Sequence, residues 1–172
     1  MSVSIRPALP ADVRGINRLV EPMTHTGILL GKDLVSYYEA VQEFLVAVDE
    51  EGDVVGCGAL HVMWEDLAEV RTLAVRDDQR GTGLGHRMLL ALLERATELG
   101  LSRVFCLTFE VGFFSRHGFE VMSEDVDPEI YNQLLRSPDE GIAEFLDLAR
   151  VKPNTLGNTR MIKQLDGRDR PE

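Results

Sequence analysis

The 172-residue sequence lacks a long apolar segment. No uninterrupted apolar run approaches the roughly 18 residues that a membrane-spanning helix needs. The N-terminus also lacks the basic-then-apolar pattern of a secretory signal peptide. We therefore expect a cytoplasmic protein with no membrane partner.

Positive charge is scarce as well. The chain has 18 Lys and Arg residues against 29 Asp and Glu residues, which gives a formal net charge of −11. Nucleic acids and anionic membranes attract basic surfaces, so this balance argues against both as partners. It does not exclude an anionic small ligand, because local basic residues decide such binding.

Cysteine is limited to Cys57 and Cys106, which both lie in apolar, strand-like runs. This placement favours buried free thiols over a disulfide and agrees with a cytoplasmic location. No Cys and His residues have the spacing of a zinc site, so we expect no metal. Cys106 also has no histidine at a spacing that indicates a cysteine nucleophile.

The hydrophobic pattern predicts a single α/β domain with a mixed sheet at residues 1–165, followed by a disordered charged tail at 166–172. Apolar runs predict strands at 3–6, 44–48, 54–62, 67–75, 102–107 and 158–165. Helical spacing predicts helices at 9–20, 33–41, 84–99, 113–117 and, with a break near residues 137–138, at 128–148.

The strongest functional signal is a strand that leads into a glycine-rich turn and then a helix. Residues 69–75 form the strand, and Gln79-Arg-Gly-Thr-Gly-Leu-Gly85 forms the turn. A helix that begins after such a turn presents free backbone N–H groups, which bind an anion such as pyrophosphate. The spacing is neither that of a Walker loop nor that of G-x-G-x-x-G. The alternative is an ordinary turn with a solvated Arg80, in which the glycines would only lower helix propensity.

The turn, read as Arg-x-x-Gly-x-Gly, resembles the acetyl-coenzyme A loop of the GCN5-related N-acetyltransferases, the GNAT family. The resemblance implies that acetyl-coenzyme A is the co-substrate. It also implies that the strand lends its backbone to the pantetheine arm, and that the thioester lies where this strand diverges from the next. The coenzyme-binding residues are then Leu73, Ala74, Val75, Arg80, Gly81, Thr82, Gly83, Leu84, Gly85, Thr108, Phe113 and Phe114.

The segment Phe113-Phe-Ser-Arg-His-Gly-Phe119 resembles the family's aromatic-x-x-x-Gly-Phe motif. Its aromatic residues either form a wall of the coenzyme site or pack in the core, and both roles are compatible. The family often has a tyrosine here that reprotonates the leaving thiolate. This chain has Phe114 at that position, so no side chain is assigned as the acid.

Glu69 is the candidate catalytic base. Strand alternation puts Glu69, Arg71, Leu73 and Val75 on one face. An amine must be neutral to attack, so a carboxylate that accepts its proton is useful, and several family members carry a base at this position. The alternative is a carboxylate that only pairs with Arg71. A backbone N–H of Leu73 or its neighbour would stabilise the oxyanion.

Segments at residues 19–30, 56–60, 68–70 and 156–162 resemble one branch of the family, the N-acetylglutamate synthases that begin arginine biosynthesis. This resemblance implies direct acetyl transfer, in a ternary complex, to the α-amino group of glutamate or glutamine. It implies a stand-alone form without the kinase-like domain of the longer synthases. Arginine would then inhibit within the single domain, and a homodimer is the default expectation.

An α-amino acid needs cations for its carboxylate. The substrate-binding candidates, with Lys152 as a further cation, are Lys32, His61, Arg71, Asn158, Thr159 and Arg160. Glu21 stands at a position where the synthases tend to have a basic residue. His61 stands at a position where they can have lysine. A second carboxylate is therefore less well neutralised, whereas an amide needs only hydrogen bonds. We predict that glutamine competes with glutamate or outdoes it.

Two alternatives remain open from the sequence. One is an acetyltransferase for another amine, such as a protein N-terminus or an aminoglycoside, which an acidic surface would suit. The other is a non-catalytic sensor of arginine or acetyl-coenzyme A, which would have less need of Glu69.

Overall fold

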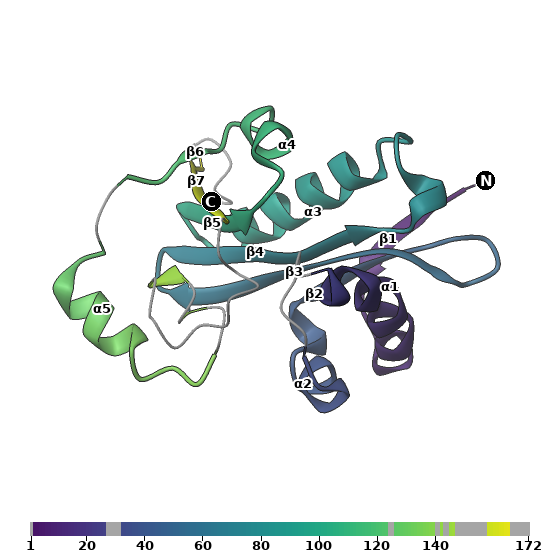
Figure 1. The fold of residues 1–172 in the computed structure, drawn as a ribbon, viewed down its shortest axis with the longest axis horizontal. Coiled ribbons are helices and arrows are strands. Elements are labelled where there is room, and N and C mark those ends of the chain that lie inside the picture. The colour runs from purple at the N-terminus through teal and green to yellow at the C-terminus, as the bar shows by residue number, and fades with distance from the viewer. Residues whose placement is uncertain are drawn as a thin grey trace.

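The computed structural model describes residues 2–26, 32–123, 126–139, 142, 145–146 and 158–165. Within these residues seven strands form one sheet in the order β1-β2-β3-β4-β5-β7-β6 (Figure 1). The strands are β1 (Ser4–Pro7), β2 (Phe44–Val48), β3 (Val54–Trp64), β4 (Leu67–Val75), β5 (Arg103–Thr108), β6 (Glu120–Val121) and β7 (Thr159–Gln164). Strands β4 and β5 are parallel, and the other neighbours are antiparallel. The predicted mixed sheet is confirmed.

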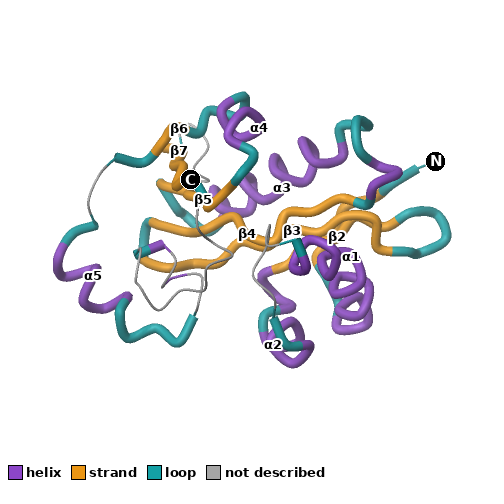
Figure 2. The backbone as a smooth tube through the Cα atoms, viewed as in Figure 1, coloured by secondary structure: helices purple, strands orange, loops and turns teal. Residues whose placement is uncertain are grey.

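Helices cover both faces of this sheet (Figure 2). Helices α1 (Val13–His25) and α2 (Leu34–Glu39) lie on one face, and α3 (Leu84–Glu98) and α4 (Val111–Ser115) lie on the other. Apolar residues at helical spacing bury one side of α3 and one side of α1 against the sheet. Among the described residues, the structure also has η1 (Pro10–Asp12), η2 (Val41–Glu43), η3 (Asp77–Gln79) and α5 (Pro128–Leu134).

Helix α1 is longer than the sequence pattern predicted. The predicted helix ended near Val20 and a loop began at Pro22, whereas the helix continues through Pro22 to His25. Pro22 has no backbone N–H, so the Arg18 carbonyl lacks its usual helical donor. The hydroxyl of Thr24 donates to the Glu21 carbonyl at 2.8 Å, which satisfies one of the last acceptors of the helix.

Strand β4 contains a β-bulge at Thr72. Its φ is +55°, and Thr72 is the one non-glycine residue with a positive φ in the described part of the chain. Cys57 pairs with Ala74 and Ala59 pairs with Arg71, so β4 has one residue more than β3 between these pairs. The bulge therefore reverses the alternation of side chains along the strand.

This reversal corrects the prediction that Glu69, Arg71, Leu73 and Val75 share one face. Leu73 and Val75 pack against the core beneath α3, whereas Ala74 belongs to the core beneath α1. Val70, which precedes the bulge, also belongs to the α3 core. Glu69 and Arg71 therefore face the α1 side of the sheet, opposite to Leu73.

The pairing of β4 with β5 ends at Glu69. It runs from Leu67 opposite Arg103 to Glu69 opposite Phe105, although β4 continues to Val75 and β5 to Thr108. The two strands thus diverge directly after Glu69. This is the point at which the family resemblance places the thioester.

Several predictions fall on other parts of the chain. The tail at 166–172, Lys152 and most of the predicted helical piece after residue 139 lie outside the described residues. Cys57 and Cys106 are buried free thiols, as predicted. In the described ranges, every helix is too short or too polar to cross a bilayer.

Candidate active site

The glycine turn after β4 has the backbone conformation that its composition predicts. Gly81 and Gly83 have φ values of +77° and +85°, which side chains other than glycine adopt at a cost. The first bond of α3 runs from the Arg87 N–H to the Gly83 carbonyl at 3.0 Å. The preceding N–H groups of Leu84 and Gly85 therefore have no helical acceptor, and this arrangement fits a bound phosphate.

The side chains of Arg80 and Thr82 make contacts within the turn itself. Arg80 is exposed and pairs with Asp77 at 3.1 Å, so its charge is partly neutralised. The Thr82 hydroxyl donates to the Gln79 carbonyl at 2.6 Å and steadies the turn. Val75 and Arg80 also line a cleft of about 480 Å³ whose other wall is α1.

The aromatic motif divides into two parts. Phe114 and Phe119 are buried in the α3 core with ring centroids 5.1 Å apart. These two aromatic residues therefore pack in the core, which is one of the two roles predicted for the motif. Phe113 is half-buried, and a Cβ at Gly85 would lie 3.9 Å from its ring. The Phe113 ring therefore extends from α4 towards the glycine turn. Thr108 is buried, and its hydroxyl accepts the Glu110 N–H at 2.8 Å.

A histidine pair, which the sequence analysis missed, joins α3 to the end of α4. The Nδ1 atom of His86 lies 2.6 Å from Nε2 of His117. The Nδ1 atom of His117 lies 2.8 Å from the Phe113 carbonyl oxygen. The pair holds the aromatic segment beside the start of α3.

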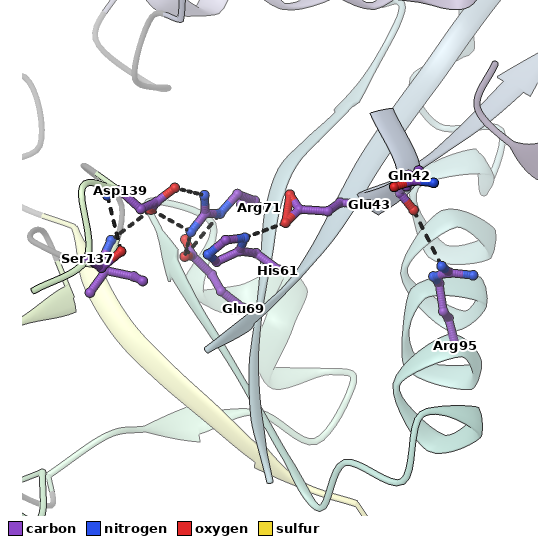
Figure 3. A network of polar contacts seen from close by, with 9 residues as sticks. Gln42, Glu43, His61, Glu69, Arg71, Arg95, Ser137 and Asp139 are labelled. Carbon is purple, nitrogen blue, oxygen red and sulfur yellow. Dashed lines mark hydrogen bonds and ion pairs between the residues drawn. The ribbon is translucent and has the colours of Figure 1, made fainter. Parts of the chain in front are cut away.

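A network of charged side chains surrounds Arg71 (Figure 3), and we refer to it as the proposed acceptor side. The Arg71 guanidinium donates to Oε2 of Glu69 at 3.2 and 2.7 Å, and to both carboxylate oxygens of Asp139 at 2.9 and 3.0 Å. The Ile142 N–H and the Asp139 carboxylate form a further bond of 3.1 Å. Glu69 and Arg71 are almost fully buried, with side chains 5% and 8% exposed.

These ion pairs shift the acid–base properties of the network. Burial alone would raise the pKa of Asp139, but the hydrogen bonds and charge of Arg71 outweigh it and lower this pKa to about 2. Burial alone would lower the pKa of Arg71, yet the charges of Glu69 and Asp139 raise it. Asp139 and Arg71 are therefore both charged at neutral pH.

His61 and Lys32 complete the acceptor side. His61, which pairs with Glu69 across β3 and β4, has its Nδ1 atom 2.5 Å from a carboxylate oxygen of Glu43. Burial and the nearby charge of Arg71 lower the pKa of Lys32, and the carboxylates of the network partly oppose this shift. In the described part of the chain, the Lys32 ammonium makes no hydrogen bond or ion pair.

The remaining predicted substrate residues lie two strands away. Thr159 and Arg160 are opposite Thr108 and Leu107 at the start of β7, and Asn158 precedes them. The Arg160 guanidinium donates to the Phe145 carbonyl at 3.1 Å. Lys32, His61, Glu69 and Arg71 are therefore brought together, whereas residues 158–160 lie at β7, with β5 between β7 and β4.

The thiol of Cys106 lies near this network. Burial, with a smaller contribution from the charge of Glu69, raises its pKa. A thiol in that state is a poor nucleophile, in agreement with direct transfer without an acyl-enzyme. In the described ranges, no cluster of three or more His, Cys, Asp or Glu side chains is placed to hold a metal ion.

The sequence profile of the acetyltransferase (GNAT) family matches residues 20–119, and the chain belongs to this family. An amino-acid acetyltransferase of Mycobacterium tuberculosis is 54% identical over 162 residues, which are 92% of each chain. The predicted family, fold, acetyltransferase activity and use of acetyl-coenzyme A are confirmed.

Two solved structures extend this comparison. The structure of Rv2747 from Mycobacterium tuberculosis, in complex with CoA and NLQ, matches with a TM-score of 0.90 at 51% identity, over 95% of this chain and 99% of that one. N-acetylglutamate synthase from Neisseria gonorrhoeae, complexed with coenzyme A and N-acetyl-glutamate, matches with a TM-score of 0.76 at 26% identity. That match covers 96% of this chain but 36% of the synthase.

Proposed function

We propose that this amino-acid N-acetyltransferase transfers the acetyl group of acetyl-coenzyme A to the α-amino group of glutamine or glutamate, as a step towards arginine. The amine nitrogen attacks the thioester carbon, an amide bond forms and the carbon–sulfur bond breaks. Glu69 takes one proton from the ammonium group, directly or through water. The nitrogen gives up its second proton as the amide forms, and the sulfur leaves as a thiolate that takes up a proton to become the thiol. The M. tuberculosis relative is an amino-acid acetyltransferase, and the match covers 92% of each chain. This similarity supports an amino acid as the acceptor.

The observation that carries this proposal is the Lys32 ammonium. It is a half-buried cation without a partner in the described ranges, in a setting that lowers its pKa. A carboxylate bound to Lys32 would offset the cost of its burial. An amino acid whose carboxylate binds Lys32 can direct its ammonium group to the nearby Glu69.

Glu69 is suited to receive a proton because its two oxygens differ. Arg71 binds Oε2, whereas Oε1 accepts no hydrogen bond from the described residues. One oxygen thus fixes the carboxylate and the other remains open to the amine. The divergence of β4 from β5 after Glu69 leaves the later residues of β4 without a strand partner on that side, which supports oxyanion stabilisation by an N–H of β4.

The coenzyme half of the proposal rests on the glycine turn. We assign the phosphates to the backbone of residues 80–85 and the pantetheine arm to residues 73–75. Thr108 and Phe113 line the same arm, whereas Phe114 contributes through the core. Phe114 has no proton to donate, so the departing sulfur is not protonated by the residue at that position.

The test is thiol release from acetyl-coenzyme A with glutamine, glutamate, the other amino acids, an aminoglycoside and a basic peptide. We expect turnover only with glutamine and glutamate, with the acetylated α-amine as product by mass spectrometry. Turnover only with the drug or peptide would move the enzyme to another acceptor class. Coenzyme binding without any turnover would favour the sensor alternative.

Other predictions accompany this proposal. Isothermal titration with arginine tests feedback inhibition, and competition with glutamine shows whether arginine binds at the acceptor site. Sedimentation tests the predicted homodimer. A cytoplasmic location is tested by fractionation of the native cells.

A further inference from the structure

Two carboxylates occupy four of the five N–H groups of the Arg71 side chain. Glu69 accepts bonds from Nε and Nη2, and Asp139 accepts bonds from Nη1 and Nη2. A guanidinium has five N–H groups, so only one is left for a ligand. Arg71 is therefore unable to offer a two-pronged clamp to a substrate carboxylate while Asp139 holds it (Figure 3).

The charges of the described acceptor side leave no cation in excess. Three carboxylates (Glu43, Glu69 and Asp139) face two cations (Lys32 and Arg71). A neutral His61 leaves this group at −1, and a protonated His61 brings it to zero. Within this group Lys32 is then the cation without a carboxylate partner, and we assign the α-carboxylate to it.

An acceptor with a second carboxylate meets an unfavourable site under these conditions. Its side-chain charge has to stay unpaired or displace Asp139 from Arg71, and both cost free energy in a buried place. A side-chain amide needs only hydrogen bonds. The place beside Arg71 and Asp139 that disfavours the side-chain carboxylate of glutamate therefore accepts the side-chain amide of glutamine.

We propose that Asp139 is a positioning residue that sets the acceptor preference: it occupies Arg71 and thereby favours a neutral side-chain amide over a carboxylate. The inference rests on the proposed function, because it concerns the choice between its two acceptors. Asp139 acts through Arg71 and touches neither reacting atom.

The experiment compares kcat/KM for glutamine and glutamate in the wild type, Asp139→Asn and Asp139→Glu. We expect the glutamine-to-glutamate ratio to fall at least tenfold in Asp139→Asn, mainly through a gain for glutamate. Asp139→Glu restores a carboxylate and should recover most of the ratio. Asp66→Asn, which breaks the distant ion pair with Arg103, is the matched control and should leave the ratio unchanged.

A ratio that stays within twofold in Asp139→Asn would overturn the inference. Coenzyme binding and thermal unfolding verify that the variant is folded. Asp139→Ser, which is also neutral and shorter, decides the question if the Asn variant does not fold. Failure of the proposed function looks different, because the wild type would then acetylate neither amino acid.

Discussion

The coenzyme side and the acceptor side of this site differ in how they are assembled. The glycine turn uses backbone groups from seven consecutive residues, 79–85. The acceptor side uses side chains from β3, β4, η2 and the segment after α5, and Arg71 and Asp139 are 68 residues apart. Backbone recognition depends on local conformation, whereas the charged network exists only once the sheet and the later segment are assembled. Variants of each side should therefore affect different kinetic constants.

The largest effect is expected from Glu69→Gln. It removes the group that accepts the amine proton, and general-base catalysis typically contributes on the order of 10²–10⁴-fold. We expect kcat to fall at least a hundredfold while the Kd for acetyl-coenzyme A, measured by titration, stays within twofold. A loss of coenzyme binding of similar size would show that the two sides are not separable.

Asp139→Asn should change acid stability. The native pKa of about 2 lies below the ordinary value of 3.8, so the carboxylate stabilises the fold above pH 4 and loses this contribution as the pH falls towards 2. The linkage corresponds to about 2 kcal/mol at neutral pH. Urea unfolding of wild type and variant should differ most at pH 6, and the difference should shrink through pH 3 and vanish only as the pH falls to about 2 and below. A constant difference across this range would contradict the assignment.

Lys32→Gln should weaken acceptor binding about tenfold, the equivalent of roughly 1.4 kcal/mol, because the α-carboxylate loses its cation. We expect the effect in KM for the amino acid and not in KM for acetyl-coenzyme A. Arg14→Gln removes an exposed cation of α1 and is the matched control. If both variants behave alike, the effect belongs to net charge and not to Lys32.

Gly83→Ala should have the smallest effect. An L-residue at φ +85° costs about 1 kcal/mol, and the strained turn presents its N–H groups less well. We expect KM for acetyl-coenzyme A to rise about fivefold, with KM for the amino acid unchanged. Gly52→Ala, at φ +87° in the β2–β3 hairpin, has the same strain in open space. It should lose similar stability without a change in either KM.

Much of the fold could be predicted from the sequence because its signals are local. The run 67–75 matches β4, and the helical spacing after the glycine turn matches α3 within one residue. The two-residue strand β6 was missed because so short a segment has no periodicity. The helix through Pro22 was missed because proline usually marks a boundary.

The charged network was predicted only in part. Glu69 and Arg71 are two residues apart on one strand, so their pairing could be anticipated. Asp139 follows a predicted helix break, and nothing in its neighbourhood indicates a partner 68 residues earlier. The bulge at Thr72 has no glycine to mark it. The predicted alternation of side chains was therefore continued past Thr72, and it wrongly put Leu73 and Val75 on the face of Glu69 and Arg71.

The histidine pair between α3 and α4 has a fixed direction. The Phe113 carbonyl is only an acceptor, so the Nδ1 atom of His117 carries a hydrogen and its Nε2 presents a lone pair. The Nδ1 atom of His86 must then be the donor across the 2.6 Å contact. Both rings are Nδ1–H tautomers when neutral, which is the less common form for free histidine in water. Nitrogen chemical shifts of these two rings would thus report directly on whether α4 is seated against α3.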